Sequence, residues 1–118
     1  MTLFAVMIGG AVGSALRFGV SEWLNPTLGS GIPWGTLAVN VTGCLFIGWV
    51  SSLLAVSHEA LRLGIVIGVL GGFTTFSSFG LEAIRLFQAD QYSAAAVYIL
   101  LSNAGGLGGA WLGLRLDQ

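Results

Sequence analysis

Residues 71–80 read GGFTTFSSFG: a glycine pair, then four hydroxyl side chains and three phenylalanines, with no charge. The stretch lies inside an apolar segment, where each glycine weakens an α-helix by about 1 kcal/mol relative to alanine. Hydroxyl side chains can satisfy backbone groups that a break sets free inside a membrane. We therefore expect an interrupted helix here, with loose carbonyls able to hold a small cation. A helix-packing face rich in glycine and serine is the alternative.

The composition indicates a membrane protein. Of the 118 residues, 55% are hydrophobic and 8% are charged, whereas soluble domains carry about 25% charged residues. An unusually apolar soluble domain is the alternative, but so few charges could not cover its surface. The net charge of −1 argues against nucleic acid as a partner, because that needs a basic surface. The single cysteine, Cys44, allows no internal disulfide.

Four apolar stretches can each supply the roughly 20 residues that a transmembrane helix needs. We expect one unit of residues 1–118, with spans at about 3–21, 34–56, 62–87 and 93–115. Asn25-Pro26 and Ile32-Pro33 predict a loop over about 22–33. The predicted fold is an all-α membrane protein with four transmembrane helices per chain, the third broken at the midplane.

The arginines are divided evenly between the two ends of this bundle. Arg62 and Arg115 flank the side of the termini, and Arg17 and Arg85 flank the opposite side. An excess of positive charge on one side normally sets the orientation of a membrane protein. The even division therefore favours insertion in both orientations and antiparallel pairing. The alternative is that another signal sets the orientation.

Glycines spaced by four recur in the first, third and fourth expected spans. This spacing lets helix backbones approach closely. The rows are Gly9 and Gly13, then Gly64, Gly68 and Gly72, then Gly105, Gly109 and Gly113. Some of these contacts must lie within the chain, but their number favours an oligomer.

Phe73, Phe76 and Phe79 recur every three residues, which predicts that they share one side of the third helix. An aromatic ring has a positive edge, and ring edges beside serine hydroxyls would suit a small anion that must lose its water. Phenylalanines that face lipid or the protein core are the alternative, which these residues alone favour.

Neutral hydrogen-bond donors recur in the second and fourth spans. The amide of Asn40 can donate twice, and Thr36 lies one turn earlier on the same helix face. Tyr98 and Ser102 are also one turn apart. Together these residues predict a track of uncharged donors, although an asparagine at this depth can instead bridge two helices.

The middle of every expected span lacks carboxylates and histidines. Glu82 comes nearest, and its spacing from Arg85 favours a surface ion pair. Proton-coupled carriers usually need an ionisable group within the membrane, and a hydrolase needs an activated nucleophile with a base. The sequence therefore predicts a protein that is not an enzyme.

Three segments resemble the Fluc, or CrcB, fluoride channels. They are GGAVGSALRF at 9–18, WGTLAVNVTGCLFIG at 34–48 and GVLGGFTTFSSFGLE at 68–82. The resemblance implies an antiparallel, dual-topology homodimer with two pores, each lined by both chains. It also implies passive fluoride export across the bacterial inner membrane, which gives fluoride resistance.

The same resemblance implies roles for individual residues. Asn40 would donate to the ion, and the ring edges of Phe76 and Phe79 would face it. A hydroxyl track would comprise Thr36, Ser78, Tyr98 and Ser102. The carbonyls of Gly71 and Thr74 would hold a central sodium ion on the two-fold axis, and Arg17 would attract anions at the pore mouth.

Two other functions fit a short, four-span chain. A small multidrug exporter also inserts in both orientations, but it needs a carboxylate in the first span, and residues 1–16 contain none. A non-conducting membrane scaffold built on the glycine rows would tolerate Asn40→Ala and Phe76→Ile. A fluoride-selective channel is the function that the sequence favours.

Overall fold

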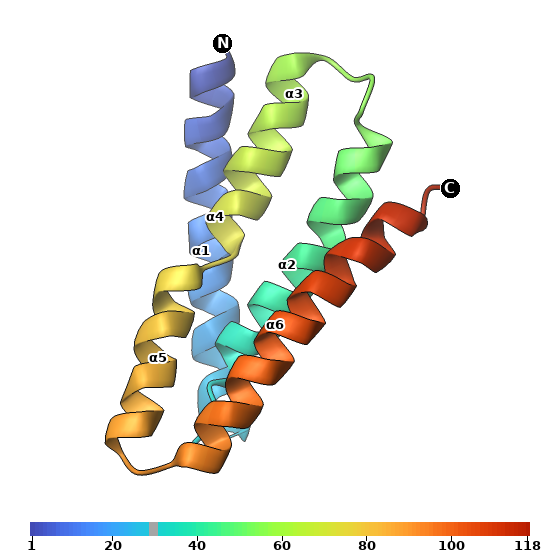
Figure 1. Cartoon of the computed structure of the whole chain (residues 1–118). Helices are drawn as coiled ribbons and strands as arrows, with labels where there is room; N and C mark the ends of the chain where they lie inside the picture. Colours follow the sequence, from blue (N-terminus) through green and yellow to red (C-terminus); the bar gives the residue numbers. More distant parts are fainter. Residues whose placement is uncertain (29–30) are drawn as a thin grey trace.

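The computed structural model describes residues 1–28 and 31–118, and all regular structure in these two ranges is helical. Within them, the stretches long and apolar enough to cross a membrane are Thr2–Asn25, Trp34–Leu53, Glu59–Gln88 and Tyr92–Arg115. The expected all-α fold with four spans is confirmed. Both termini and the turn before α3 lie toward the same end of the bundle (Figure 1).

The first helix reaches further than expected. α1 (Thr2–Leu28) continues past Asn25-Pro26, so the loop predicted over about 22–33 is shorter than that range. Asn25 Oδ1 accepts a hydrogen bond of 2.8 Å from the N–H of Gly35, in the first turn of α2 (Trp34–Leu53). Such N–H groups have no acceptor within their own helix. The longer α1 therefore supplies a cap for α2.

The third span is interrupted, but not at the glycine pair. Its parts are α3 (Glu59–Leu63), the π-helical segment η1 (Gly64–Leu70), α4 (Gly71–Phe73) and α5 (Phe76–Gln88). The extended residues are Thr74, with ψ of 157°, and Thr75, with ψ of 124°. Gly72 is still helical, and a Cβ on it would lie 2.9 Å from the Gly10 carbonyl oxygen. This glycine therefore allows close packing on α1 and does not itself form the break.

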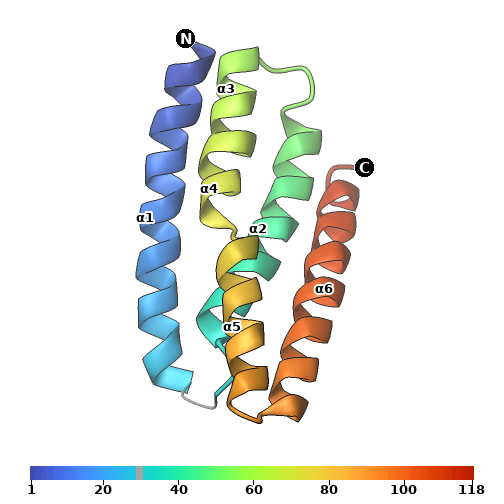
Figure 2. The ribbon, with the colours of Figure 1, turned by 60° about the vertical axis from the view of Figure 1, so that its left-hand side comes forward.

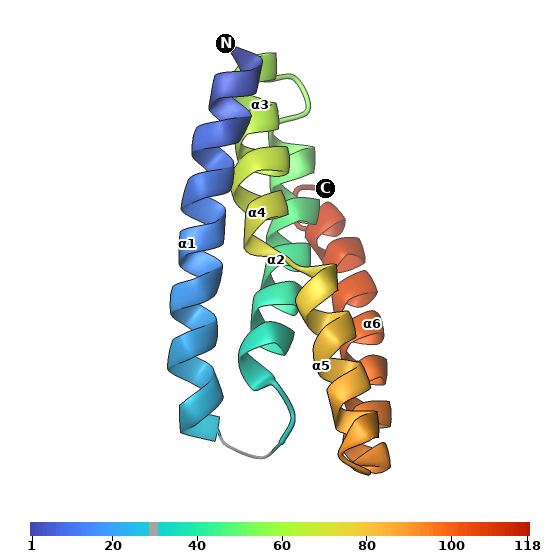
Figure 3. The same cartoon turned by 90° about the vertical axis from the view of Figure 1, so that its left-hand side faces the viewer.

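The break changes the helix against which the third span packs. η1 and α4 pack on α1, whereas α5 packs on α6 (Tyr92–Arg115), which also runs along α2. Figures 2 and 3 show α5 displaced from the line of α4. Buried apolar side chains join α2, α5 and α6 below the break: Leu37, Phe79, Ala83, Leu86, Ala95 and Tyr98.

The glycine rows make their contacts within the chain. A Cβ added to Gly13 of α1 would collide with the carbonyl oxygen of Val69 in η1. A Cβ added to Gly113 of α6 would likewise collide with the carbonyl oxygen of Leu45 in α2. The expected close helix contacts are therefore confirmed. Because these contacts are made inside one chain, the rows do not by themselves indicate an oligomer.

Candidate functional site

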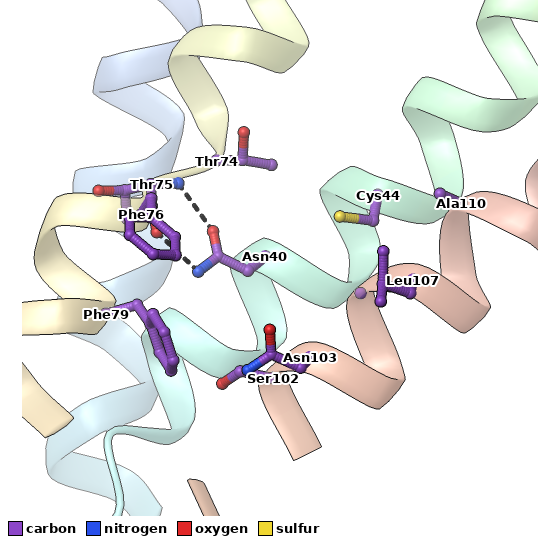
Figure 4. Close-up of a pocket in the computed structure, with 11 residues that line it drawn as sticks. Asn40, Cys44, Thr74, Thr75, Phe76, Phe79, Ser102, Asn103, Leu107 and Ala110 are labelled. Atoms are coloured by element: carbon purple, nitrogen blue, oxygen red, sulfur yellow. Dashed lines mark hydrogen bonds between the residues drawn. The ribbon is translucent and has the colours of Figure 1, made fainter. Parts of the chain in front are cut away.

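The side chain of Asn40 holds the break in the third span (Figure 4). Its Nδ2 donates to the carbonyl oxygen of Thr75 at 2.8 Å, and its Oδ1 accepts from the N–H of Thr75 at 2.7 Å. An unpaired backbone group in apolar surroundings costs about 2–7 kcal/mol. The amide therefore makes an extended residue tolerable inside a membrane span. Within the described residues, the second N–H of this amide has no partner.

The break releases several backbone carbonyls, among them those of Gly71 and Thr74. In a continuous helix, the carbonyl of Gly71 would accept from the N–H of Thr75, and that of Thr74 from the N–H of Ser78. The first N–H instead donates to Asn40, and the second donates to Thr75 Oγ1 at 3.2 Å. Carbonyls freed by an unwound helix coordinate sodium in membrane transporters. Gly71 and Thr74 thus fit the cation site that the resemblance implies.

A carbonyl site needs no ionised side chains. In the part of the chain that the structure describes, no group of three or more His, Cys, Asp or Glu side chains could hold a metal ion. A sodium site here would depend on neutral oxygen atoms, such as the backbone carbonyls of the break.

A groove of about 280 Å³ lies beside the break, and we call it the amide groove. Its lining side chains carry no charge: Asn40, Cys44, Thr74, Thr75, Phe76, Phe79, Ser102, Asn103, Gly106, Leu107 and Ala110. The groove is open at its side, because Phe76, Asn103 and Leu107 are exposed. A single chain in a bilayer would therefore leave polar atoms facing lipid, where water cannot satisfy them.

The two phenylalanines of the groove differ in burial. Phe76 is 82% exposed, whereas Phe79 is 9% exposed and packs on Tyr98 with ring centroids 5.2 Å apart. The rings of Phe76 and Phe79 are 5.6 Å apart and tilted by 53°. Phe73 belongs to α4, before the break, so the expected row of three phenylalanines is divided. Phe79 is fixed in the core, and Phe76 forms the open edge of the groove.

Two hydroxyl groups near this groove are buried without a partner. Neither Tyr98 Oη nor Ser102 Oγ makes a hydrogen bond within residues 1–28 and 31–118. Buried polar atoms are nearly always paired in proteins. Ser102 lines the amide groove, so its hydroxyl is available to a water molecule or an ion, whereas Tyr98 is fully buried.

A second cavity of about 400 Å³ shares Thr75 with the amide groove, and we call it the arginine cavity. It is lined by Arg17, Phe18, Ser21, Thr36, Thr75, Ser78, Leu81, Glu82 and Arg85. Thr36 Oγ1 donates to both carboxylate oxygens of Glu82, at 2.8 and 3.2 Å. Glu82 therefore pairs with a residue on α2 instead of forming the expected surface ion pair with Arg85. The packing of α5 over the start of α2 is the reason.

The structure distributes the predicted site residues over the two cavities. The amide groove contains Asn40, Thr74, Phe76, Phe79 and Ser102. The arginine cavity contains Arg17, Thr36 and Ser78. Tyr98 is buried behind Phe79, and Gly71 is exposed beside the break, so neither lines a cavity.

Sequence reasoning missed Thr75 and Asn103. Thr75 acts through its backbone, which residue types do not reveal. Asn103 directly follows the predicted Ser102 in the same span. A search for every amide in an expected span would have found it.

A family model for CrcB-like proteins, described as "CrcB-like protein, Camphor Resistance (CrcB)", matches residues 4–114. The chain belongs to this family. This CrcB-like chain is therefore a multi-pass integral membrane protein, in agreement with its four apolar stretches.

Curated relatives of this CrcB-like chain carry the name "Fluoride-specific ion channel FluC". The relative from Rhizobium johnstonii is 50% identical over 100 residues, which cover 82% of this chain and 80% of the relative. The relative from Pseudomonas fluorescens Pf-5 is 43% identical over 119 residues, 98% of this chain and 96% of the relative. The relative from Agrobacterium fabrum is 45% identical over 116 residues, 96% and 93% of the two chains.

Proposed function

We propose that this chain forms a fluoride-selective channel, a transport protein that passively exports fluoride and gives fluoride resistance. The observation that carries the proposal is the amide groove, which holds amides, hydroxyls and phenyl rings within the spans and no ionised side chain. The names of relatives at 43–50% identity support it. We assign the protein to the bacterial inner membrane.

The physical problem is the hydration of fluoride. Burying a bare ion unaided costs tens of kcal/mol, so protein donors must replace its water. The free N–H of Asn40 and the unpaired hydroxyl of Ser102 are suitable donors in the groove, and the Tyr98 hydroxyl would join them if Phe79 moved aside. The positive ring edges of Phe76 and Phe79 add weaker electrostatic attraction. Neutral groups also let the ion leave, as conduction requires.

We propose that the arginine cavity is the entrance to this path. The lining holds two arginines and one carboxylate, that of Glu82, so positive charge is in excess and Arg17 would raise the local concentration of anions. Thr75 belongs to both cavities, and Ser78 follows it by one turn of α5. The ion would pass from the Ser78 hydroxyl to the amide groove, and Thr36 would join this track by exchanging its bond to Glu82 for one to the ion.

We further propose that a second, antiparallel copy closes the amide groove. The polar side of the groove is open in one chain, and a second copy would cover it and duplicate the path, giving two pores. A sodium ion held by Gly71 and Thr74 of both copies would supply a fixed positive charge between them. The release of these carbonyls by the break supports this site.

Efflux from liposomes tests the function. The purified protein is reconstituted in vesicles loaded with potassium fluoride or potassium chloride, and valinomycin is added to let potassium follow. Rapid fluoride efflux with little chloride efflux supports the channel. Equal efflux of the two anions, or none above that of protein-free vesicles, contradicts it.

Purification without sodium tests the cation site. Replacing sodium by N-methylglucamine throughout should slow fluoride efflux, and adding sodium back should restore it. Efflux that is independent of sodium contradicts the proposed ion.

A further inference from the structure

Asn103 is the second amide of the amide groove. It lies on α6, whereas Asn40 reaches the groove from α2. Figure 4 shows both side chains at the groove, with Asn103 beside Ser102. Asn103 is exposed, although it lies near the middle of the candidate span Tyr92–Arg115.

Asn40 uses more of its hydrogen-bonding groups than Asn103 does. Asn40 uses its oxygen and one N–H to hold Thr75. Asn103 uses one N–H, which donates to the carbonyl oxygen of Ile99 at 2.8 Å in its own helix. Within the described residues, its oxygen and its second N–H have no partner. Asn103 therefore has the freer amide.

The surroundings of Asn103 make lipid an unsuitable partner for this amide. An amide in the hydrocarbon region needs hydrogen-bond partners, because lipid tails offer none. On the α6 wall of the groove, its neighbours Gly106, Leu107 and Ala110 have no polar side-chain atoms. The nearest other polar side chain on that wall is Ser102, whose hydroxyl is also unpaired.

We infer that Asn103 donates its free N–H to fluoride in the amide groove and is a specificity-determining residue of the path. This inference rests on the proposed channel function. Asn103 and Ser102 supply the donors on the α6 wall, opposite the donor of Asn40. An ion in the groove would thus be held from two helices, and not from α2 alone.

Fluoride efflux from liposomes tests the inference with two variants. Asn103→Leu removes the amide at nearly the same volume, and loss of one hydrogen bond to an ion should slow fluoride efflux by about tenfold. Asn103→Asp should slow efflux at neutral pH and recover part of it at mildly acidic pH, because a protonated carboxyl group regains a donor. Leu100→Val changes an exposed residue of α6 that lines neither cavity, and efflux should stay as in the unmodified protein.

Gel filtration and thermal unfolding separate a folding defect from a defect in conduction. The inference is overturned if folded Asn103→Leu conducts within about twofold of the unmodified protein, since a lost ionic hydrogen bond should cost more. It is also overturned if efflux through Asn103→Asp does not respond to pH, a result that remains decisive if Asn103→Leu fails to fold. The inference is overturned as well if Asn103→Leu only weakens dimerisation and leaves the selectivity for fluoride unchanged. Asn103 would then contribute to the contact between the two copies instead. Failure of the unmodified protein to conduct would overturn the proposed function as well, whereas the other outcomes bear on Asn103 alone.

Discussion

The Asn40 amide forms a two-point bridge to the backbone of Thr75, with hydrogen bonds of 2.8 and 2.7 Å. The two residues are 35 positions apart in the chain. The bridge gives Thr75 the donor and the acceptor that a helix would have provided. One side chain on α2 thus stabilises both the break in the third span and the groove beside it.

Replacement of Asn40 by Asp should destabilise the fold and abolish most fluoride efflux. A carboxylate can still accept from the N–H of Thr75 but cannot donate to its carbonyl, and an unsatisfied buried group costs about 1–3 kcal/mol. Thermal unfolding in detergent measures the loss. Thr42→Val is the control, because the Thr42 hydroxyl bonds only to its own helix. Equal melting temperatures for the two variants would contradict a stabilising role of the bridge.

The two phenylalanines of the groove should respond differently to replacement by isoleucine. Phe76→Ile should leave stability nearly unchanged, because the ring is 82% exposed, but should slow fluoride efflux. Phe79→Ile should slow efflux and also cost about 1 kcal/mol of stability through its lost ring contact with Tyr98. Unfolding and efflux measured on the same preparations distinguish these effects. Normal efflux through Phe76→Ile would show that this ring does not take part in the fluoride path.

Gly13→Ala should destabilise the packing of α1 on η1. The added Cβ would collide with the Val69 carbonyl oxygen, and an overpacked contact of this kind typically costs about 1–3 kcal/mol. Gly19→Ala is the matched control, since a Cβ there has no neighbour within 4 Å. That control should gain up to about 1 kcal/mol from higher helix propensity. If Gly13→Ala and Gly19→Ala shift the melting temperature in the same direction, the close contact at Gly13 is contradicted.

Arg17→Gln should slow fluoride efflux severalfold at low ionic strength. Arg17 lines the arginine cavity, and its attraction for anions weakens as the Debye length falls to about 3 Å at about 1 M salt. Efflux measured across a salt series checks this, with salt added equally on both sides. Arg115→Gln removes the same charge from a guanidinium stacked over Trp111 at 4.8 Å and outside both cavities. An electrostatic role for Arg17 would be excluded if the loss of fluoride efflux did not depend on salt. It would also be excluded if Arg17→Gln and Arg115→Gln lost the same amount of efflux.

Three lysines inserted after Ala89, in the turn between α5 and α6, should bias insertion toward one orientation. The unmodified chain has two arginines near each end, so the added positive charge would decide the orientation. Fewer antiparallel dimers would then form, and efflux should fall; three inserted serines are the control. Accessibility labelling of introduced cysteines measures the orientation. A single orientation in the unmodified protein would refute dual insertion.

Several interactions within the bundle could not be derived from sequence patterns. The glycine pair predicted an interruption in the third span, but the extended residues are Thr74 and Thr75, because the Asn40 amide binds there. Glu82 has Arg85 at helical spacing, yet its carboxylate is bonded to Thr36, 46 residues away. Local spacing identifies candidate partners along one helix. It does not show which neighbouring helix competes for them.

The roles of individual site residues remain predictions that depend on the resemblance. Residue types alone left Asn40 as either an ion ligand or a bridge between helices, and the structure uses its amide for a bridge while leaving one N–H free. Sequence gave no reason to separate Phe76 from Phe79. Their different burial depends on how α5 meets α6.

By itself, the sequence determined the membrane location, the four spans and the presence of a weak point in the third. These follow from transfer free energies and helix propensities, which add up residue by residue along the chain. The position of the break, the intrachain use of the glycine rows and the grouping of donors around one groove were decided only by the tertiary structure. They depend on contacts between helices far apart in sequence, where the geometry of packing selects one partner among several of similar chemistry.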